Sequence, residues 1–129
     1  NMNEKNTKYL LENYPKLYEQ YYCPMEETCM CWGFECADGW FNIIDDLSKK
    51  ITEIAPDVRA VQVKEKFGGL RFYINGGNDE VYALINQAED LSYKTCEYCG
   101  STENVTQTRG WIVSLCPLCK LELEQQRNS

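Results

Sequence analysis

Two cysteine pairs near the C-terminus offer the clearest chemistry in this sequence. Cys96 and Cys99 form one C-x2-C pair, Cys116 and Cys119 form another, and sixteen residues separate the pairs. This spacing is typical of structural zinc sites, in which each pair makes a tight turn that points both sulfur atoms to one side. Gly100 supplies the backbone freedom that such a turn often needs after its second cysteine. Four thiolates leave no open coordination position, so the sequence predicts one structural, non-catalytic Zn²⁺.

The alternative for these pairs is two dithiols that are redox-active or merely buried. A redox-active C-x2-C pair usually opens a helix after a strand, and a single pair is enough for that chemistry. The presence of two pairs therefore favours a metal site.

Four further cysteines lie closer to the N-terminus. They are Cys23, Cys29, Cys31 and Cys36, and their spacing is not that of paired zinc turns. Three interpretations stay open: a second zinc site, small buried apolar residues, or free thiols. Because the segment between residues 23 and 37 has no clean hydrophobic period, we expect an irregular loop there.

The chain contains no histidine. This excludes a Ser-His-Asp triad, a Cys-His dyad, HExxH zinc chemistry and the histidine-dependent deaminase signature. An enzyme would have to use other groups, and the candidate carboxylates are Glu35, Asp38, Asp45 and Glu65. Asp38 is better explained as the N-cap of a helix.

A β-hairpin is predicted over residues 58–75, where apolar and polar residues alternate on both sides of Gly68-Gly69. With these glycines as a primed turn, Lys66 faces Arg71 and Lys64 faces Tyr73. Lys64, Lys66, Arg71 and Tyr73 then share the face away from the core. This face is either a solvated charge cluster, neutralised by nearby acids, or a binding surface for a protein or a small anion.

Glu65 falls on the apolar face of this hairpin, opposite Phe72. A buried carboxylate needs a partner, so Glu65 either pairs inside the molecule or is turned outward by a β-bulge. Acid–base catalysis by Glu65 is the minority interpretation.

Helical periods surround the hairpin. Residues 4–22 repeat apolar positions every three or four residues, with an interruption at Pro15, and residues 39–54 follow Asp38 as a central helix. A third helix starts at residue 78 or 79.

The C-terminal part is predicted to contain two short strands, over residues 105–108 and 111–115, and a short helix after Pro117. The expected fold class is α+β, with helices packed on a β-hairpin and a C-terminal zinc-ribbon-like module. We expect a single domain over residues 1–129, made of the helices and hairpin (1–93) and the module (94–129).

Composition and charge limit the classes of function. The chain has 129 residues, 43% of them apolar, and a net charge of −7. The composition is that of a folded protein, and an acidic chain is repelled by nucleic acid at long range. No apolar run reaches the ~18 residues of a membrane span and no secretion signal is visible, so we expect a cytoplasmic protein without a membrane partner.

Three motifs resemble a family of small uncharacterised proteins from bacteria, prophages and phages. They are Trp32–Cys36, Asp38–Phe41 and the hairpin Val63–Tyr73 with its VKEKFGGLRFY sequence, followed by two C-x2-C pairs around a Gly-Trp. The likeness covers roughly residues 8–120, and the hairpin motif is its most specific part. The resemblance implies a prophage-associated setting in a bacterial host cell, and it brings no activity to particular residues.

The sequence favours a non-enzymatic, zinc-stabilised binding protein, phage or prophage encoded, that acts on a host or defence component through a protein or a small anionic ligand. The alternative is a nucleic-acid-binding zinc-ribbon protein, which the net charge disfavours. A weaker alternative is a histidine-free enzyme that uses carboxylates. The oligomeric state is not predicted.

Overall fold

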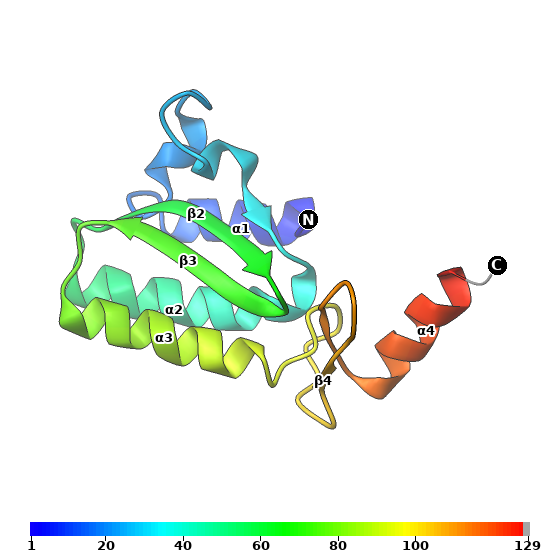
Figure 1. Cartoon of the computed structure of the whole chain (residues 1–129). Coiled ribbons are helices and arrows are strands. Elements are labelled where there is room, and N and C mark those ends of the chain that lie inside the picture. Colours follow the sequence, from blue (N-terminus) through cyan, green and yellow to red (C-terminus); the bar gives the residue numbers. More distant parts are fainter. Residues whose placement is uncertain (128–129) are drawn as a thin grey trace.

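The α+β class predicted from the sequence is confirmed. A computed structural model describes residues 1–127 (Figure 1). Its α-helices are α1 Glu4–Asn13, α2 Phe41–Ile54, α3 Asp79–Ser92 and α4 Pro117–Arg127. Its strands are β1 Phe34–Glu35, β2 Arg59–Lys66, β3 Gly69–Asn75, β4 Thr106–Gln107 and β5 Ser114–Leu115, and its 3₁₀ turns are η1 Glu19–Tyr22, η2 Met30–Trp32 and η3 Asp38–Trp40.

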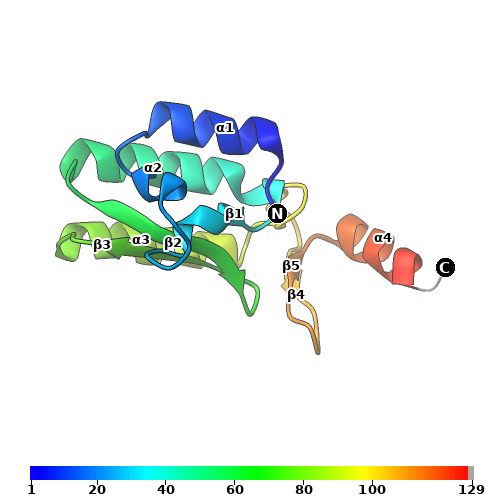
Figure 2. The same ribbon diagram turned by 90° about the horizontal axis from the view of Figure 1, so that it is seen from above.

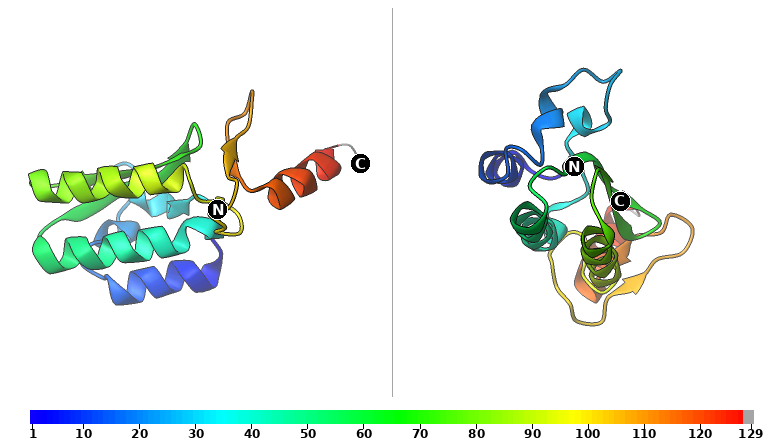
Figure 3. Two further views of the ribbon diagram at one scale, coloured as in Figure 1. Left: turned by 90° about the horizontal axis from the view of Figure 1, so that it is seen from below. Right: turned by 90° about the vertical axis from the view of Figure 1, so that its left-hand side faces the viewer.

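A mixed sheet and three helices build the larger part of the molecule. The strand order is β1-β2-β3, with β1 parallel and β3 antiparallel to β2. Helices α2 and α3 lie side by side under the sheet, and α1 lies along the outer side of α2 (Figures 2 and 3). The ring of Tyr9 packs edge-on against Phe41 at the contact between α1 and α2.

The core lies between the helices and the sheet. Trp40, Ile44 and Val63 are fully buried there. Tyr18 is also fully buried, and its ring packs edge-on against Phe34 at a centroid separation of 4.9 Å. Burial of these large apolar side chains is the main stabilising contribution to the sheet and helices.

The hairpin turn is one residue earlier than predicted. Phe67 and Gly68 form the turn, with φ of +53° and +85°. Lys66 therefore pairs with Gly69, and Lys64 pairs with Arg71, so the predicted facing pair of Lys66 and Arg71 is wrong. A two-residue turn with two positive φ angles is of the predicted primed kind.

Close packing explains the position of Gly69. A Cβ atom at Gly69 would lie 2.4 Å from the Cζ and Oη atoms of Tyr93. The first glycine of the pair thus serves the backbone of the turn, and the second lets α3 approach β3. A break in register between Ala60 and Gln62 further shifts the pairing at the other end of the hairpin.

Two helix boundaries differ from the sequence prediction. The central helix α2 begins at Phe41, after the 3₁₀ turn η3, and Asp38 does not cap it. The carboxylate of Asp38 instead accepts hydrogen bonds from the backbone N–H of Asn3 and the side chain of Asn6, which fixes the start of α1. The helical period of residues 4–22 gives a single α-helix, which ends at Asn13 before Pro15. From Pro15 to Tyr22 the chain forms turns and η1.

The C-terminal module consists of the short β4–β5 ribbon and α4. Figures 1 and 2 show α4 projecting away from the sheet and helices. The module strands are shorter than predicted, with two residues each. Within residues 1–127, no helix is both long enough and apolar enough to cross a membrane.

Candidate metal centre

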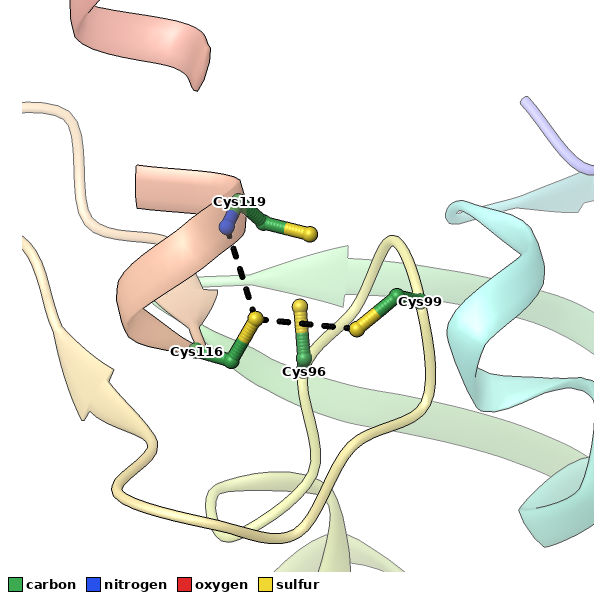
Figure 4. A group of neighbouring side chains, drawn as sticks. All are labelled: Cys96, Cys99, Cys116 and Cys119. Atoms are coloured by element: carbon green, nitrogen blue, oxygen red, sulfur yellow. Dashed lines mark hydrogen bonds between the residues drawn. The ribbon is translucent and has the colours of Figure 1, made fainter. Parts of the chain in front are cut away.

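The four C-terminal cysteines converge on one point. Their sulfur atoms, from Cys96, Cys99, Cys116 and Cys119, all lie within 4.8 Å of one another (Figure 4). Cys99 Sγ and Cys116 Sγ are 3.6 Å apart. Zn–S bonds of about 2.3 Å in a tetrahedron place sulfur atoms about 3.8 Å apart, so this geometry fits a metal ion such as zinc.

Two different local structures present the sulfurs. Cys96 and Cys99 lie on the turn that follows α3, where Gly100 N–H donates to the Cys96 carbonyl at 3.0 Å. Cys116 and Cys119 lie at the junction of β5 and α4, and Cys119 N–H donates to Cys116 Sγ at 3.4 Å. Backbone N–H groups aimed at sulfur stabilise thiolates.

The crowding of the thiols opposes full ionisation of the cluster. Burial favours a neutral Cys96, but backbone hydrogen bonds, led by that of Cys116, outweigh it and lower the pKa of Cys96 to about 7. Burial and the neighbouring thiols raise the pKa of Cys119. A divalent ion would remove the repulsion between thiolates, and four thiolates would leave it no open position for substrate.

The metal ligands are also a large part of the module core. The buried residues there are Cys96, Val113, Leu115 and Cys116, with Val105, Cys119 and Leu123 partly buried around them. Three of these seven residues are candidate metal ligands. So small an apolar cluster offers little folding energy by itself, which is why metal binding would stabilise this segment directly.

The first cysteine turn is joined to the start of the central helix. Gly39 N–H donates to the Glu97 carbonyl at 2.7 Å, and Trp40 Nε1 donates to the Thr95 carbonyl at 3.0 Å. A Cβ atom at Gly39 would lie 2.2 Å from the Cys96 carbonyl oxygen. Only glycine permits this approach, so the Asp38–Phe41 motif and the first C-x2-C pair form one structural unit.

Glu97 adds a side-chain link at the same place. Its carboxylate accepts a hydrogen bond from Ala37 N–H at 2.9 Å while the residue is almost completely buried. Burial raises the pKa of Glu97, and the Ala37 amide opposes that shift. This buried acid was not among the residues singled out in the sequence.

The hairpin tip makes a second joint with the module. Ser114 Oγ donates to the Gly68 carbonyl at 2.5 Å, and Gln107 Nε2 donates to Ser114 Oγ at 3.0 Å. Glu65 Oε2 accepts from Gly68 N–H at 2.8 Å, so Glu65 fixes the turn. The hairpin motif thus supports the module as well as the sheet.

The N-terminal cysteines do not form a second centre. Within residues 1–127, the C-terminal cluster is the only group of three or more potential ligand side chains close enough together to share a metal ion. Cys31 Sγ donates to the Thr28 carbonyl at 3.4 Å. Cys36 is buried in the main core, and burial raises the pKa of its thiol. Cys36 therefore fits the interpretation of a small buried apolar residue, and the second-zinc alternative has no support.

The predicted partner-binding residues are divided between different surroundings. Lys64 and Tyr73 line a groove, whereas Lys66 Nζ lies over the Phe67 ring at the turn. Arg71 is bound to Glu89 Oε2 at 2.9 Å and to the Tyr93 hydroxyl at 3.2 Å, which occupies its guanidinium. The strand register places all four residues on one face of the hairpin, as predicted, but the guanidinium of Arg71 is already bound by Glu89 and Tyr93.

The candidate carboxylates have mostly structural partners. Asp38 fixes α1 and Glu65 fixes the hairpin turn, as described above. Asp45 Oδ1 accepts from the Tyr14 hydroxyl at 2.5 Å. Glu35 Oε1 is buried with no hydrogen-bond partner among the described residues.

No protein-family model, curated protein or solved structure matches this chain. Of the resemblance noted in the sequence, the structure confirms the four-cysteine cluster. The assignment of the metal centre is therefore supported by the positions of the four cysteines alone.

Proposed function

We propose that this protein is a non-enzymatic, zinc-stabilised binding protein, encoded by a phage or prophage and acting in the cytoplasm of a bacterial host. Its partner is a host or defence protein, or a small anionic ligand. The closed set of four thiolates supports a structural metal, because it leaves no position for catalysis.

The proposed binding site is a groove on the sheet. It has a volume of about 630 Å³ and lies between the β2–β3 face and the segment that contains η1 and η2. Lys64, Gln62 and Tyr73 line one side, and Cys23 and Cys29 line the other. A cleft of this size can take a small ligand or the side chains of a partner protein.

The charge of Lys64 is available in this groove. Among the ion pairs of residues 1–127, none involves Lys64. Tyr73 is exposed beside it and offers a ring and a hydroxyl. An unpaired cation next to an exposed tyrosine suits an anionic group on a ligand or partner.

The test is a paired capture experiment. The double variant Lys64→Glu/Tyr73→Ala should lose binding in two assays, pull-down from a bacterial host lysate and NMR titration with inorganic phosphate and citrate. The matched control is Lys94→Glu/Tyr82→Ala, which changes an exposed lysine and an exposed tyrosine away from the groove. Equal binding by both variants, with unchanged thermal stability, would contradict the groove proposal.

A further inference from the structure

Two loops that are distant in sequence lie side by side on one side of the molecule, where the sheet and helices meet the C-terminal module. The β2–β3 turn and the loop between β4 and β5 point in the same direction in two views (Figures 2 and 3). They also touch, because Ser114 Oγ binds the Gly68 carbonyl and a Cβ atom at Gly68 would lie 3.2 Å from Ile112 Cγ2. The metal centre and the hairpin therefore fix the relative position of the two loop tips.

Each loop tip displays an aromatic ring beside a cation. Phe67 is 62% exposed and Trp111 is 72% exposed. Lys66 Nζ lies 5.6 Å from the centroid of Phe67, and Arg127 Cζ lies 5.8 Å from the centroid of Trp111. Arg109 is exposed in the same loop as Trp111. We call Lys66, Phe67, Arg109, Trp111 and Arg127 the tip surface.

The backbone at Phe67 argues that its ring has a use outside the core. Phe67 has a φ of +53°, a conformation that a bulky residue adopts at a cost and that asparagine or glycine adopts readily. The ring contributes little to the core, because most of it is exposed. A phenylalanine held at a strained loop tip is a feature that stability alone does not explain.

The charged residues of the tip surface are all cations, although the chain as a whole is acidic. Lys66, Arg109 and Arg127 contribute three positive charges, whereas the net charge of the chain is −7. The acid next to the turn, Glu65, directs its carboxylate to Gly68 N–H. The tip surface thus combines two exposed rings with neighbouring cations.

We propose that the tip surface binds single-stranded nucleic acid, with Phe67 and Trp111 stacking on bases and the three cations contacting phosphates. Exposed rings beside cations suit the bases and phosphates of a single strand. A duplex hides its bases, and its dense charge meets the acidic remainder of the protein. An acidic protein segment would use the cations but would have little need of two flat rings.

The number of cations sets the expected salt dependence. Three phosphate contacts on a single strand give a slope of about −2 in a plot of log K against log salt concentration. Stacking on one ring contributes about a tenfold gain in affinity, within the range measured for such contacts. Binding is therefore expected to be modest and sensitive to both ring and charge variants.

The experiment is fluorescence anisotropy of the zinc-loaded protein with a labelled single-stranded oligonucleotide of about ten mixed bases. Phe67→Asn removes a ring and keeps the turn, because asparagine tolerates positive φ. Phe67→Asn and Trp111→Ala should each weaken binding about tenfold. Trp32→Ala, which removes a 58% exposed ring from η2, should leave binding unchanged.

Three results would overturn this proposal. The protein would fail to bind the single strand, the Phe67→Asn/Trp111→Ala double variant would bind it as tightly as the wild type, or a duplex would bind as tightly as the single strand. A poly-glutamate peptide that displaces the oligonucleotide at an equal charge concentration would assign the tip surface to an acidic protein instead. Lys64→Glu should leave oligonucleotide binding intact, so this test is independent of the groove.

Discussion

The body of the protein, residues 1–93, and its C-terminal module are stabilised in different ways. The main core contains twenty buried residues drawn from all three helices and the sheet. The module core contains four, and two of these are candidate metal ligands. Hydrophobic burial is extensive in the body, whereas the apolar core of the module is so small that we expect a bound metal ion to stabilise it.

The two regions are nevertheless coupled at two joints. At the first, Gly39 and Trp40 bind the turn that carries Cys96. At the second, the hairpin carbonyl of Gly68 accepts from Ser114. Loss of the metal should therefore destabilise the body locally at these joints. Loss of a joint should in turn weaken metal binding.

The largest expected effect comes from removing the metal. Cys116→Ser, or a strong chelator, should abolish hydrogen-exchange protection over residues 94–127, because structural zinc supplies about 10 kcal/mol or more of folding energy to small modules. Helices α1 and α2 should keep most of their protection, since the main core does not include the ligands. Retained protection at Val113 and Leu115 after metal loss would contradict the contrast between the regions.

The first joint can be broken without touching a ligand. Gly39→Ala places a Cβ atom 2.2 Å from the Cys96 carbonyl oxygen. Because both atoms belong to or are fixed by the backbone, a side-chain rotation cannot remove this clash. We expect a loss of roughly 3 kcal/mol in unfolding free energy, together with weaker metal binding in a chelator competition. Gly110→Ala is the control, because its Cβ atom has nothing within 4 Å and the cost is only that of its φ of +74°. Similar losses in the two variants would mean that the joint is not tight.

A smaller effect is expected inside the body at Gly69. Gly69→Ala pushes a Cβ atom against the Tyr93 ring and should cost roughly 2 kcal/mol by chemical denaturation. Tyr93→Ala should remove most of that additional cost when it is combined with Gly69→Ala. Additive losses in this double-mutant cycle would show that Gly69 is needed for its backbone rather than for the space that it leaves.

The smallest expected effect concerns alkaline stability. Burial, together with the hydrogen bond to Asp45, raises the pKa of Tyr14 above its usual value of about 10. The stability that Tyr14 contributes is therefore fully present below about pH 10 and is lost as the pH rises beyond that. Tyr14→Phe should cost about 1 kcal/mol at neutral pH and should flatten the decline of unfolding free energy above about pH 10. An unchanged decline would rule out this role for Tyr14.

The parts of the fold that repeat a pattern could be predicted from the sequence. The apolar stripe from Ile44 to Ile51 and the apolar–polar alternation around Val63 indicate which face of each element is buried. Helix α2 and the hairpin could therefore be predicted. The cysteine spacing predicted the cluster for a similar reason, because two C-x2-C turns have only a few ways to share one ion.

The remaining features depend on residues that meet only in the folded chain. Which glycine of Gly68-Gly69 makes the turn depends on Tyr93, and the role of Asp38 depends on Asn3. The tip surface was missed because Trp111 and Arg127 are distant in sequence from the hairpin. The Gly39-Trp40 pair was the one feature of the sequence that could have indicated a close contact at the first joint. The large separation in sequence between Gly39 and Cys96 gave no indication of the partner.

The most direct test of the central claim is the metal content of the intact protein, measured by native mass spectrometry after purification without oxygen. We expect about one zinc ion per chain in the wild type and in Cys29→Ser, and none in Cys116→Ser. Cys29→Ser is the matched control, because it replaces a cysteine of the N-terminal set with the same residue. A wild-type protein without zinc, or zinc that persists in Cys116→Ser and disappears in Cys29→Ser, would contradict the assignment of the metal centre.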